Sequence, residues 1–137
     1  MKLWRPAALM ALSLTLLAGC ATLDERQRDW IFQPSDRSWG GAQSTEGMQD
    51  VWIELPTQAD GRPEQLHGLW LPQPQADAPV LLYLHGARWN VAGSSGRIRR
   101  MHELGFSVLA IDYRGFGKSS AGLPSEASSA EDARAAW

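Results

Sequence analysis

The sequence predicts an α/β fold in which an antiparallel hairpin leads into an incomplete, doubly wound parallel sheet. Residues 50–55 place Val51, Ile53 and Leu55 on one face and Trp52 and Glu54 on the other, as a half-buried strand does, and residues 66–71 form a second strand. Residues 80–84 and 106–112 are two mainly apolar runs separated by a helical pattern, which is typical of parallel strands joined by a crossover helix. A chain of 137 residues has room for one such domain.

The first two strands are expected to form a hairpin. The stretch DVWIEL (50–55) and the stretch LHGLWL (66–71) are separated by a polar connection that contains Asp60-Gly61, a frequent hairpin-turn pair. Pro72 ends the second strand because proline cannot donate to a sheet ladder. We expect Trp52 and Trp70 to pair across this hairpin.

The apolar run VLLYL (80–84) is expected to be a central strand that helices cover on both sides. Ser94 or Ser95 can cap the helix that follows, which runs to about Leu104 and is closed by Gly105. The stretch FSVLAID (106–112) is the next strand.

The segment after the Gly/Ser/Pro-rich loop at 113–126 begins another helix. Its start can be capped in two ways, by a capping box of Ser128 with Glu131 or by one of Ser129 with Asp132. The order of elements is therefore hairpin, strand, helix, strand and helix, which is the front of a doubly wound α/β domain.

The N-terminus has the pattern of an export signal. Positive residues Lys2 and Arg5 precede an apolar run, Ala7–Gly19, that is too short to cross a bilayer core of about 30 Å as a helix. Cys20, the single cysteine, ends the run Leu-Ala-Gly-Cys, which resembles the bacterial lipobox. The resemblance implies that Cys20 is lipidated and then becomes the first residue of the mature chain.

The predicted organisation is therefore a lipoprotein signal peptide at 1–19, a tether and irregular segment at 20–48, and a domain at 49–137. The membrane is the expected partner, through the lipid anchor. The residue after Cys20 is Ala21 and not an aspartate. By similarity to bacterial lipoproteins, this implies the outer membrane of the cell envelope, facing the periplasm.

Charge and composition exclude several other classes. Lys and Arg number 13 against 15 Asp and Glu, so the net charge of −2 gives no reason to expect nucleic acid as a partner. One cysteine leaves no disulfide framework. We expect no cofactor and no metal centre.

Three motifs in order resemble the N-terminal half of an α/β-hydrolase, most closely the serine-aminopeptidase-like and lysophospholipase-like branch. They are a strand that ends in YLHG (83–86), the stretch DYRGFGKS (112–119), and PSE (124–126) ahead of a helix. His-Gly alone is a weak signal, but the three motifs at this spacing are specific. The similarity runs from about Asp50 to Trp137.

The resemblance implies an oxyanion hole after the strand at 80–84, where backbone N–H groups meet developing negative charge. It assigns the donor to the Ala87 N–H, with His85 and Gly86 as structural parts of the motif. The sequence Ala-Arg-Trp-Asn at 87–90 departs from the small polar segment usual in the family, so a tight turn without a catalytic role stays an alternative.

The other chemical side chains are interpreted as structural. The family's general base lies near the end of the domain, so His85 is not expected to be that base. His67 and His102, on a predicted strand and helix, are expected to be packed or solvated. Asp112 lies beside Arg114 and is expected to form a local ion pair or to cap the loop.

No catalytic residue is identified. An acyl-transfer serine sits on a sharp strand-to-helix elbow, G-x-S-x-G. The run GKSSA (117–121) puts Ser119 in the centre, but no apolar strand leads into it. The run GFGKSS imitates a phosphate-binding loop, yet Asp112 stands where the first glycine is required. Nucleophile, acid and base are therefore absent from the sequence.

Two hypotheses follow. The first is an incomplete envelope-anchored serine hydrolase, inactive alone, whose full-length form would hydrolyse an ester, thioester or peptide with a small acyl substrate through an acyl-enzyme. The second is a non-catalytic lipoprotein module whose open sheet pairs with another chain.

Overall fold

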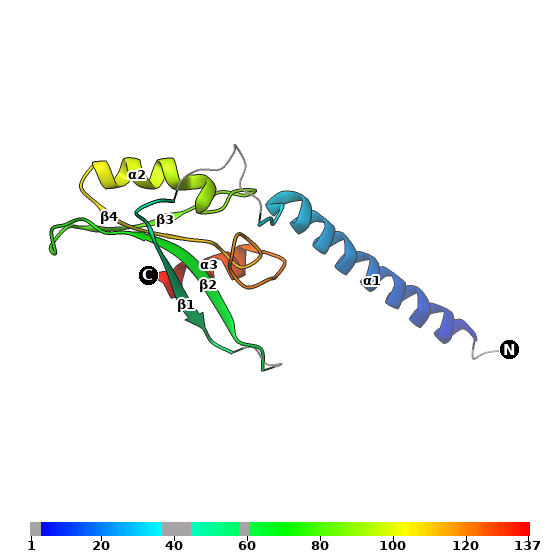
Figure 1. Cartoon of the computed structure of the whole chain (residues 1–137). Helices are drawn as coiled ribbons and strands as arrows, with labels where there is room; N and C mark the ends of the chain where they lie inside the picture. The colour runs from blue at the N-terminus through cyan, green and yellow to red at the C-terminus, as the bar shows by residue number, and fades with distance from the viewer. Residues whose placement is uncertain (1–3, 37–44, 58–60) are drawn as a thin grey trace.

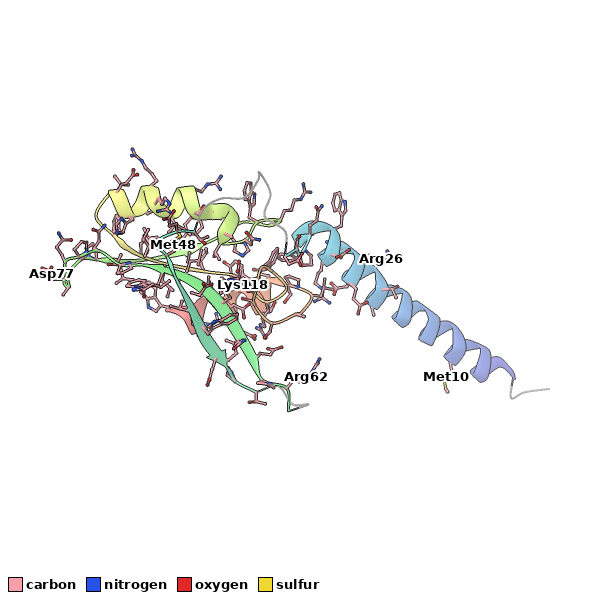
Figure 2. All side chains as sticks on the ribbon, viewed as in Figure 1. Met10, Arg26, Met48, Arg62, Asp77 and Lys118 are labelled. Carbon is pink, nitrogen blue, oxygen red and sulfur yellow. The ribbon has the colours of Figure 1, made fainter. Side chains whose placement is uncertain are left out.

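The computed structural model describes residues 4–36, 45–57 and 61–137. A long helix, α1 (Trp4–Phe32), projects away from a domain built on one sheet (Figure 1). Met10, on the distant half of α1, is 69 % exposed and points into solvent (Figure 2). Among the described residues, no helix is both long enough and apolar enough to span a membrane.

The sheet has four strands in the order β1-β2-β4-β3. Strands β1 (Gln49–Leu55) and β2 (Glu64–Leu71) form the antiparallel hairpin, and β2 also pairs antiparallel with β4 (Ser107–Ile111). Strand β3 (Val80–Leu84) pairs parallel with β4. The predicted fold class is confirmed: a hairpin continues into a parallel β-α-β unit.

The register of the hairpin differs from the prediction. Trp52 lies opposite His67, with their rings 5.1 Å apart, and Trp70 lies opposite Gln49. The predicted pairing of Trp52 with Trp70 is therefore wrong. Register is set by the length of the connection, which spans 56–63, and not by side-chain similarity. Asp60 lies outside the described residues, whereas Gly61 has a φ of +79°.

Strand β4, and not β3, is the central parallel strand. Four of the five residues of β4 are buried, whereas the ends of β3, Val80 and Leu84, are 61 % and 41 % exposed. The prediction that 80–84 is a central strand is wrong for the described chain, because β3 is the outer strand of the sheet. The outer edge of this apolar strand therefore has no neighbouring strand among the described residues.

Helices cover the two faces of the sheet. On one face α2 (Ser95–Glu103) closes a core with β2 and β4, formed by Leu69, Leu71, Val91, Ile98, Val108 and Ala110. On the other face, the end of α3 (Glu126–Ala136) lies with Leu82 and Leu109 around a small pocket. Figure 1 shows α2 and α3 on opposite sides of the strands. This double cover confirms the doubly wound arrangement.

The starts of the two short helices agree with the prediction only in part: Ser94 is the N-cap of α2 as predicted, but its side chain does not supply the capping hydrogen bond. A 3₁₀ turn, Ala92–Ser94, precedes α2, and the side chain of Asn90 accepts a hydrogen bond from the Gly93 N–H at 2.7 Å, while Ser94 makes no side-chain cap. The capping box of α3 is Ser125 with Ser128, three residues before the predicted start. Ser125 follows Pro124 in an extended conformation, which is the geometry of an N-cap.

The segment predicted to be irregular, 20–48, is helical as far as Phe32. Its residues 23–29 are mostly good helix formers, and Arg28 pairs with Asp24 one turn earlier at 3.0 Å. These local preferences extend α1 up to the domain. This matters for the site, because the last turn of α1 reaches the carboxyl ends of β3 and β4.

Candidate functional site

The candidate site lies where β3 and β4 end. Ligands of open α/β sheets bind at the carboxyl ends of parallel strands. Here the turn after β3, the loop after β4 and the last turn of α1 meet around a pocket of about 200 Å³. The lining residues are mainly apolar: Ile31, Phe32, His85, Gly86, Ala87, Tyr113, Phe116 and Ser129.

Hydrogen bonds to Gly86 orient the turn after β3. The His85 Nδ1–H and the Trp89 N–H both donate to the Gly86 carbonyl, at 2.8 and 3.3 Å. The peptide bond is trans, so the Ala87 N–H points away from that carbonyl. No hydrogen-bond partner of this N–H is found among the described residues. The geometry leaves Ala87 able to donate to a ligand in the pocket, and its catalytic role stays a prediction.

The backbone N–H of Arg88, the next residue, already has a hydrogen-bond partner. Its N–H donates to the Phe32 carbonyl at 3.0 Å, and its φ of +67° is in the left-handed region. The turn is thus clamped to the end of α1. Of these two neighbouring N–H groups, only that of Ala87, a residue that lines the pocket, has no hydrogen-bond partner among the described residues. Sequence reasoning missed Phe32, because its carbonyl is a backbone group 56 residues earlier in the chain.

His85 is a buried, neutral histidine. Burial lowers its pKa below the ordinary value. The Gly86 carbonyl can only accept a hydrogen bond, so His85 Nδ1 is the protonated ring nitrogen. His85 Nε2 then accepts a hydrogen bond from the Tyr113 N–H at 3.4 Å. The rings of Tyr113 and Phe116 stand edge-on to the imidazole, each 5.0 Å away. These contacts fix His85 as a support of the turn.

His67 is not simply packed. It is buried, and its Nδ1 lies 2.7 Å from Asp112 Oδ2 while its Nε2 lies 2.6 Å from Asp50 Oδ1, which also binds Lys118 Nζ at 2.8 Å. We call these four residues the His67 cluster. Burial opposes the charged imidazole, but the two carboxylates outweigh it and raise the pKa of His67. Lys118 and then His67 lower the pKa of Asp50.

Asp112 caps the loop that follows it. Its carboxylate accepts from the Val91 N–H at 2.8 Å and from the Lys118 N–H at 3.4 Å, besides its contact with His67. Gly117, with a φ of +51°, lets the loop close over this carboxylate, because a Cβ there would collide with it. The loop cap that we predicted is present, but the partner of Asp112 is His67 and not Arg114.

The phosphate-loop likeness of GFGKSS has the same explanation. Backbone N–H groups in such a loop form a small anion-binding hollow. In this chain the anion is the side chain of Asp112 itself, and Lys118 reaches Asp50. The loop has no place left for a phosphate at this point.

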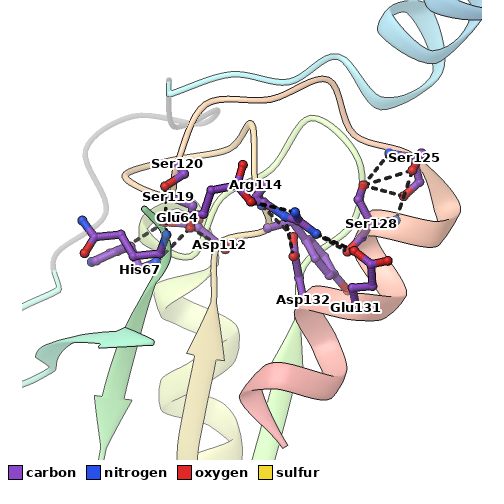
Figure 3. A network of polar contacts seen from close by, with 12 residues as sticks. Glu64, His67, Asp112, Arg114, Ser119, Ser120, Ser125, Ser128, Glu131 and Asp132 are labelled. Carbon is purple, nitrogen blue, oxygen red and sulfur yellow. Dashed lines mark hydrogen bonds and ion pairs between the residues drawn. The ribbon is translucent and has the colours of Figure 1, made fainter. Parts of the chain in front are cut away.

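Ser119, His67 and Asp112 lie together without forming a catalytic triad (Figure 3). Ser119 Oγ accepts from the His67 backbone N–H at 2.9 Å and donates to the Asp112 carbonyl at 2.5 Å. A triad needs the imidazole Nε2 at the serine hydroxyl. The geometry therefore agrees with our reading of Ser119 as a loop residue that ties the loop to β2.

Arg114 joins α3 to the hairpin. Its guanidinium binds Asp132 at 2.7 Å, Glu64 at 2.8 Å and Glu131 at 2.9 Å, and its backbone N–H also donates to Asp132 (Figure 3). Burial raises the pKa of Asp132 against the opposing hydrogen bonds and charge of Arg114. This network is structural, since its groups saturate one another.

Two other predicted positions lie apart from the pocket. His102 Nε2 contacts the Pro72 carbonyl at 3.0 Å, at the opposite end of the sheet from His85. Cys20 is an exposed, free cysteine on α1. Across residues 4–36, 45–57 and 61–137, no three His, Cys, Asp or Glu side chains are grouped to hold a metal ion.

Comparisons with known proteins agree with the fold. A crystal structure of an α/β hydrolase from Vibrio vulnificus superposes with a TM-score of 0.57 at 22 % identity, over 83 % of this chain and 40 % of that one. The chain is 33 % identical to the uncharacterized protein MT2364 of Mycobacterium tuberculosis over 99 % of its own length and 48 % of the relative. No protein-family model matches the chain.

A third similarity is to a lipase. Lysophosphatidylserine lipase ABHD12 of Danio rerio is 34 % identical over 66 % of this chain and 25 % of the relative. The chain spans 24–48 % of the length of the curated relatives it matches. The α/β-hydrolase-type fold is confirmed, and the similarity to a lipase supports a relationship with α/β hydrolases.

Proposed function

We propose that this chain is the N-terminal part of a serine hydrolase and supplies the oxyanion side of its active site. The observation that carries the proposal is the Ala87 N–H, which is unpaired within the described chain and lies at an apolar pocket beyond β3. Residues outside this chain would supply the nucleophile, the acid and the base, because the sequence contains no elbow serine.

The proposed reaction is acyl transfer followed by hydrolysis of an acyl-enzyme. A serine attacks the carbonyl of an ester, thioester or peptide, and the oxygen that gains negative charge is stabilised by preorganised N–H donors such as that of Ala87. Loss of one such donor costs about 10²–10³ in kcat. The name of the Danio rerio relative favours a carboxylic ester among these substrates.

The test compares two proteins. The 137-residue chain should hydrolyse a p-nitrophenyl ester only at background rate, whereas the protein that continues through the downstream reading frame should turn it over and react with a fluorophosphonate. A downstream frame that encodes no G-x-S-x-G elbow would contradict the proposal. Turnover by the short chain that is lost in Ser119→Ala would overturn our reading of that serine.

We further propose that Cys20 carries a lipid that anchors the chain in the bacterial cell envelope, at the outer membrane facing the periplasm. The support is the short apolar run before an exposed free cysteine. Cys20→Ala should release the protein into soluble fractions or block its processing. An unchanged membrane association of that variant would contradict the anchor.

A second candidate is a non-catalytic module that pairs with another chain, which the open edge of β3 fits as well as it fits an incomplete hydrolase. Strand β3 has a ladder on one side only, and its apolar ends are exposed. Such an edge can accept a strand from a partner. A chain that is monomeric and unfolds cooperatively, with no elbow serine encoded downstream, would favour this module over the hydrolase.

A further inference from the structure

The segment from Ile31 to Asp36 precedes the sheet domain but belongs to the pocket. Three of its carbonyls accept hydrogen bonds from the loops on either side of the candidate site. The Phe32 carbonyl accepts from the Arg88 N–H at 3.0 Å, that of Ser35 from the Gly117 N–H at 3.1 Å, and that of Asp36 from the Asn90 side chain at 3.4 Å. The end of α1 is therefore fixed across both loops.

The side chains of this segment form one wall of the pocket. Ile31 and Phe32 line it from α1, opposite Tyr113 and Phe116 from the loop after β4. Ile31 is 46 % exposed, so its apolar surface stays open instead of being covered by the domain. Ala87 lines the same pocket, and its N–H is free to meet a ligand carbonyl. The rest of the lining is mainly apolar, with Tyr113 and Ser129 as polar side chains within it.

The pocket is small and is open to solvent on one side. Sites for drug-sized ligands usually have volumes of about 300–1,000 Å³. The pocket beside Ala87 has a volume of about 200 Å³. A short apolar chain whose polar end faces Ala87 suits this volume.

We propose that Ile31 and Phe32 are specificity-determining residues that form the acyl-binding wall of this site and restrict it to short acyl groups. The inference rests on the proposed function for the identity of the ligand as an acyl group. It adds that a part of the chain outside the sheet domain selects the length of that group. An acyl chain enters between Ile31, Phe32 and Phe116 with its carbonyl oxygen at the Ala87 N–H.

The experiment uses the 137-residue chain and butanoate, whose carboxylate stands in for the acyl carbonyl. Binding is followed by NMR through the chemical shift of the Ala87 amide. Butanoate should shift this amide saturably, and Ile31→Trp, which fills the cavity, should weaken the apparent affinity at least tenfold. Phe32→Ala should enlarge the cavity and move the preference from butanoate toward octanoate.

Trp30→Ala is the matched control, since Trp30 is the neighbour of Ile31 on α1, is 74 % exposed and does not line the pocket. It should bind butanoate as the unchanged chain does. Because Ile31 is partly exposed, its substitution is compatible with folding, and the dispersion of the remaining amide signals checks this. An Ala87 amide that does not move, or moves equally in Ile31→Trp, overturns the proposal.

The result separates this inference from the proposed function. Butanoate binding that depends on Ile31, in a protein whose extended form hydrolyses no ester, supports an acyl-binding wall and rejects the hydrolase. Hydrolysis by the extended form with a chain-length preference that Ile31→Trp and Phe32→Ala leave unchanged rejects the wall and supports the hydrolase.

Discussion

His67 and His85 are both buried, yet their surroundings move their pKa values in opposite directions. His67 has carboxylates at both ring nitrogens, whereas His85 has a carbonyl and a backbone N–H. Two negative partners outweigh the burial of His67 and raise its pKa. At His85 burial dominates and lowers the pKa, although Asp112 Oδ1 lies 3.8 Å away.

The two residues should therefore give opposite pH dependences of stability. A raised folded pKa adds stability that is complete below the ordinary value of 6.5 and is lost as the pH rises through the folded value. A lowered folded pKa adds stability that is present above 6.5 and is lost as the pH falls. The stability lost in His67→Gln should be larger at about pH 5 than at pH 8, and that lost in His85→Gln larger at pH 8.

Urea unfolding of the three proteins across this pH range measures the effect. Asp50 and Lys118 also face His67, and the lowered pKa of Asp50 removes its contribution only as the pH falls below the ordinary value of 3.8. Asp50 therefore does not mask the change between pH 5 and 8. Equal pH slopes for the two variants would show that the partners of the histidines are not those described.

The sequence predicted the roles of single residues better than it predicted which residues they contact. The sequence predicted that Asp112 forms a local ion pair or caps its loop, and the cap is the alternative that the structure shows. It could not predict that Asp112 binds His67, 45 residues earlier, since that contact depends on the pairing of β2 with β4. Ala87 was named from a motif, whereas the carbonyl of Phe32 that clamps its neighbour leaves no sequence signal.

At the level of elements, the types and order within the sheet domain were predicted, and so were the ends of α2, whereas the start of α3 and the helix up to Phe32 were not. Several serines near residue 125 satisfy the same capping rule, so local sequence left the start of α3 open. Tertiary contacts decide it: Asp132 is turned inward to Arg114 and cannot return to a cap at Ser129. Residues 23–29 of α1 are helix formers by local sequence, whereas the end of α1 at Phe32 is held by the turn after β3, a contact that local sequence does not show.

The cap of α3 can be tested directly. Ser125 Oγ accepts from the Ser128 N–H at 3.1 Å, so Ser125→Ala leaves that donor without a partner and should cost about 1 kcal/mol of unfolding free energy. Ser129→Ala is the control, because the hydroxyl of Ser129 caps nothing and alanine is the better helix former. Urea midpoints of the two variants distinguish them; a larger loss for Ser129→Ala would restore the predicted cap.

At the level of the whole molecule, the described sheet is asymmetric. The outer edge of β1 carries Asp50 and Glu54, and charged residues protect an edge from pairing with another chain. The edge of β3 carries none: its five residues are Val, Leu, Leu, Tyr and Leu. Exposed apolar surface continues from Val80 along the small pocket between the strands and the end of α3 to Trp137, which is 91 % exposed.

We therefore expect the isolated chain to self-associate through the β3 edge. Val80→Lys places a charge beside the unpaired ladder, where desolvation opposes strand addition, and should shift the chain toward monomer in sedimentation velocity. Leu104→Lys is the matched control: Leu104 is 60 % exposed against 61 % for Val80, but it follows α2, away from the sheet edge. If exposed apolar area alone drove association, both substitutions would reduce it equally. A selective effect of Val80→Lys identifies β3 as the edge that a further strand covers, whether that strand comes from the rest of a hydrolase or from a partner chain.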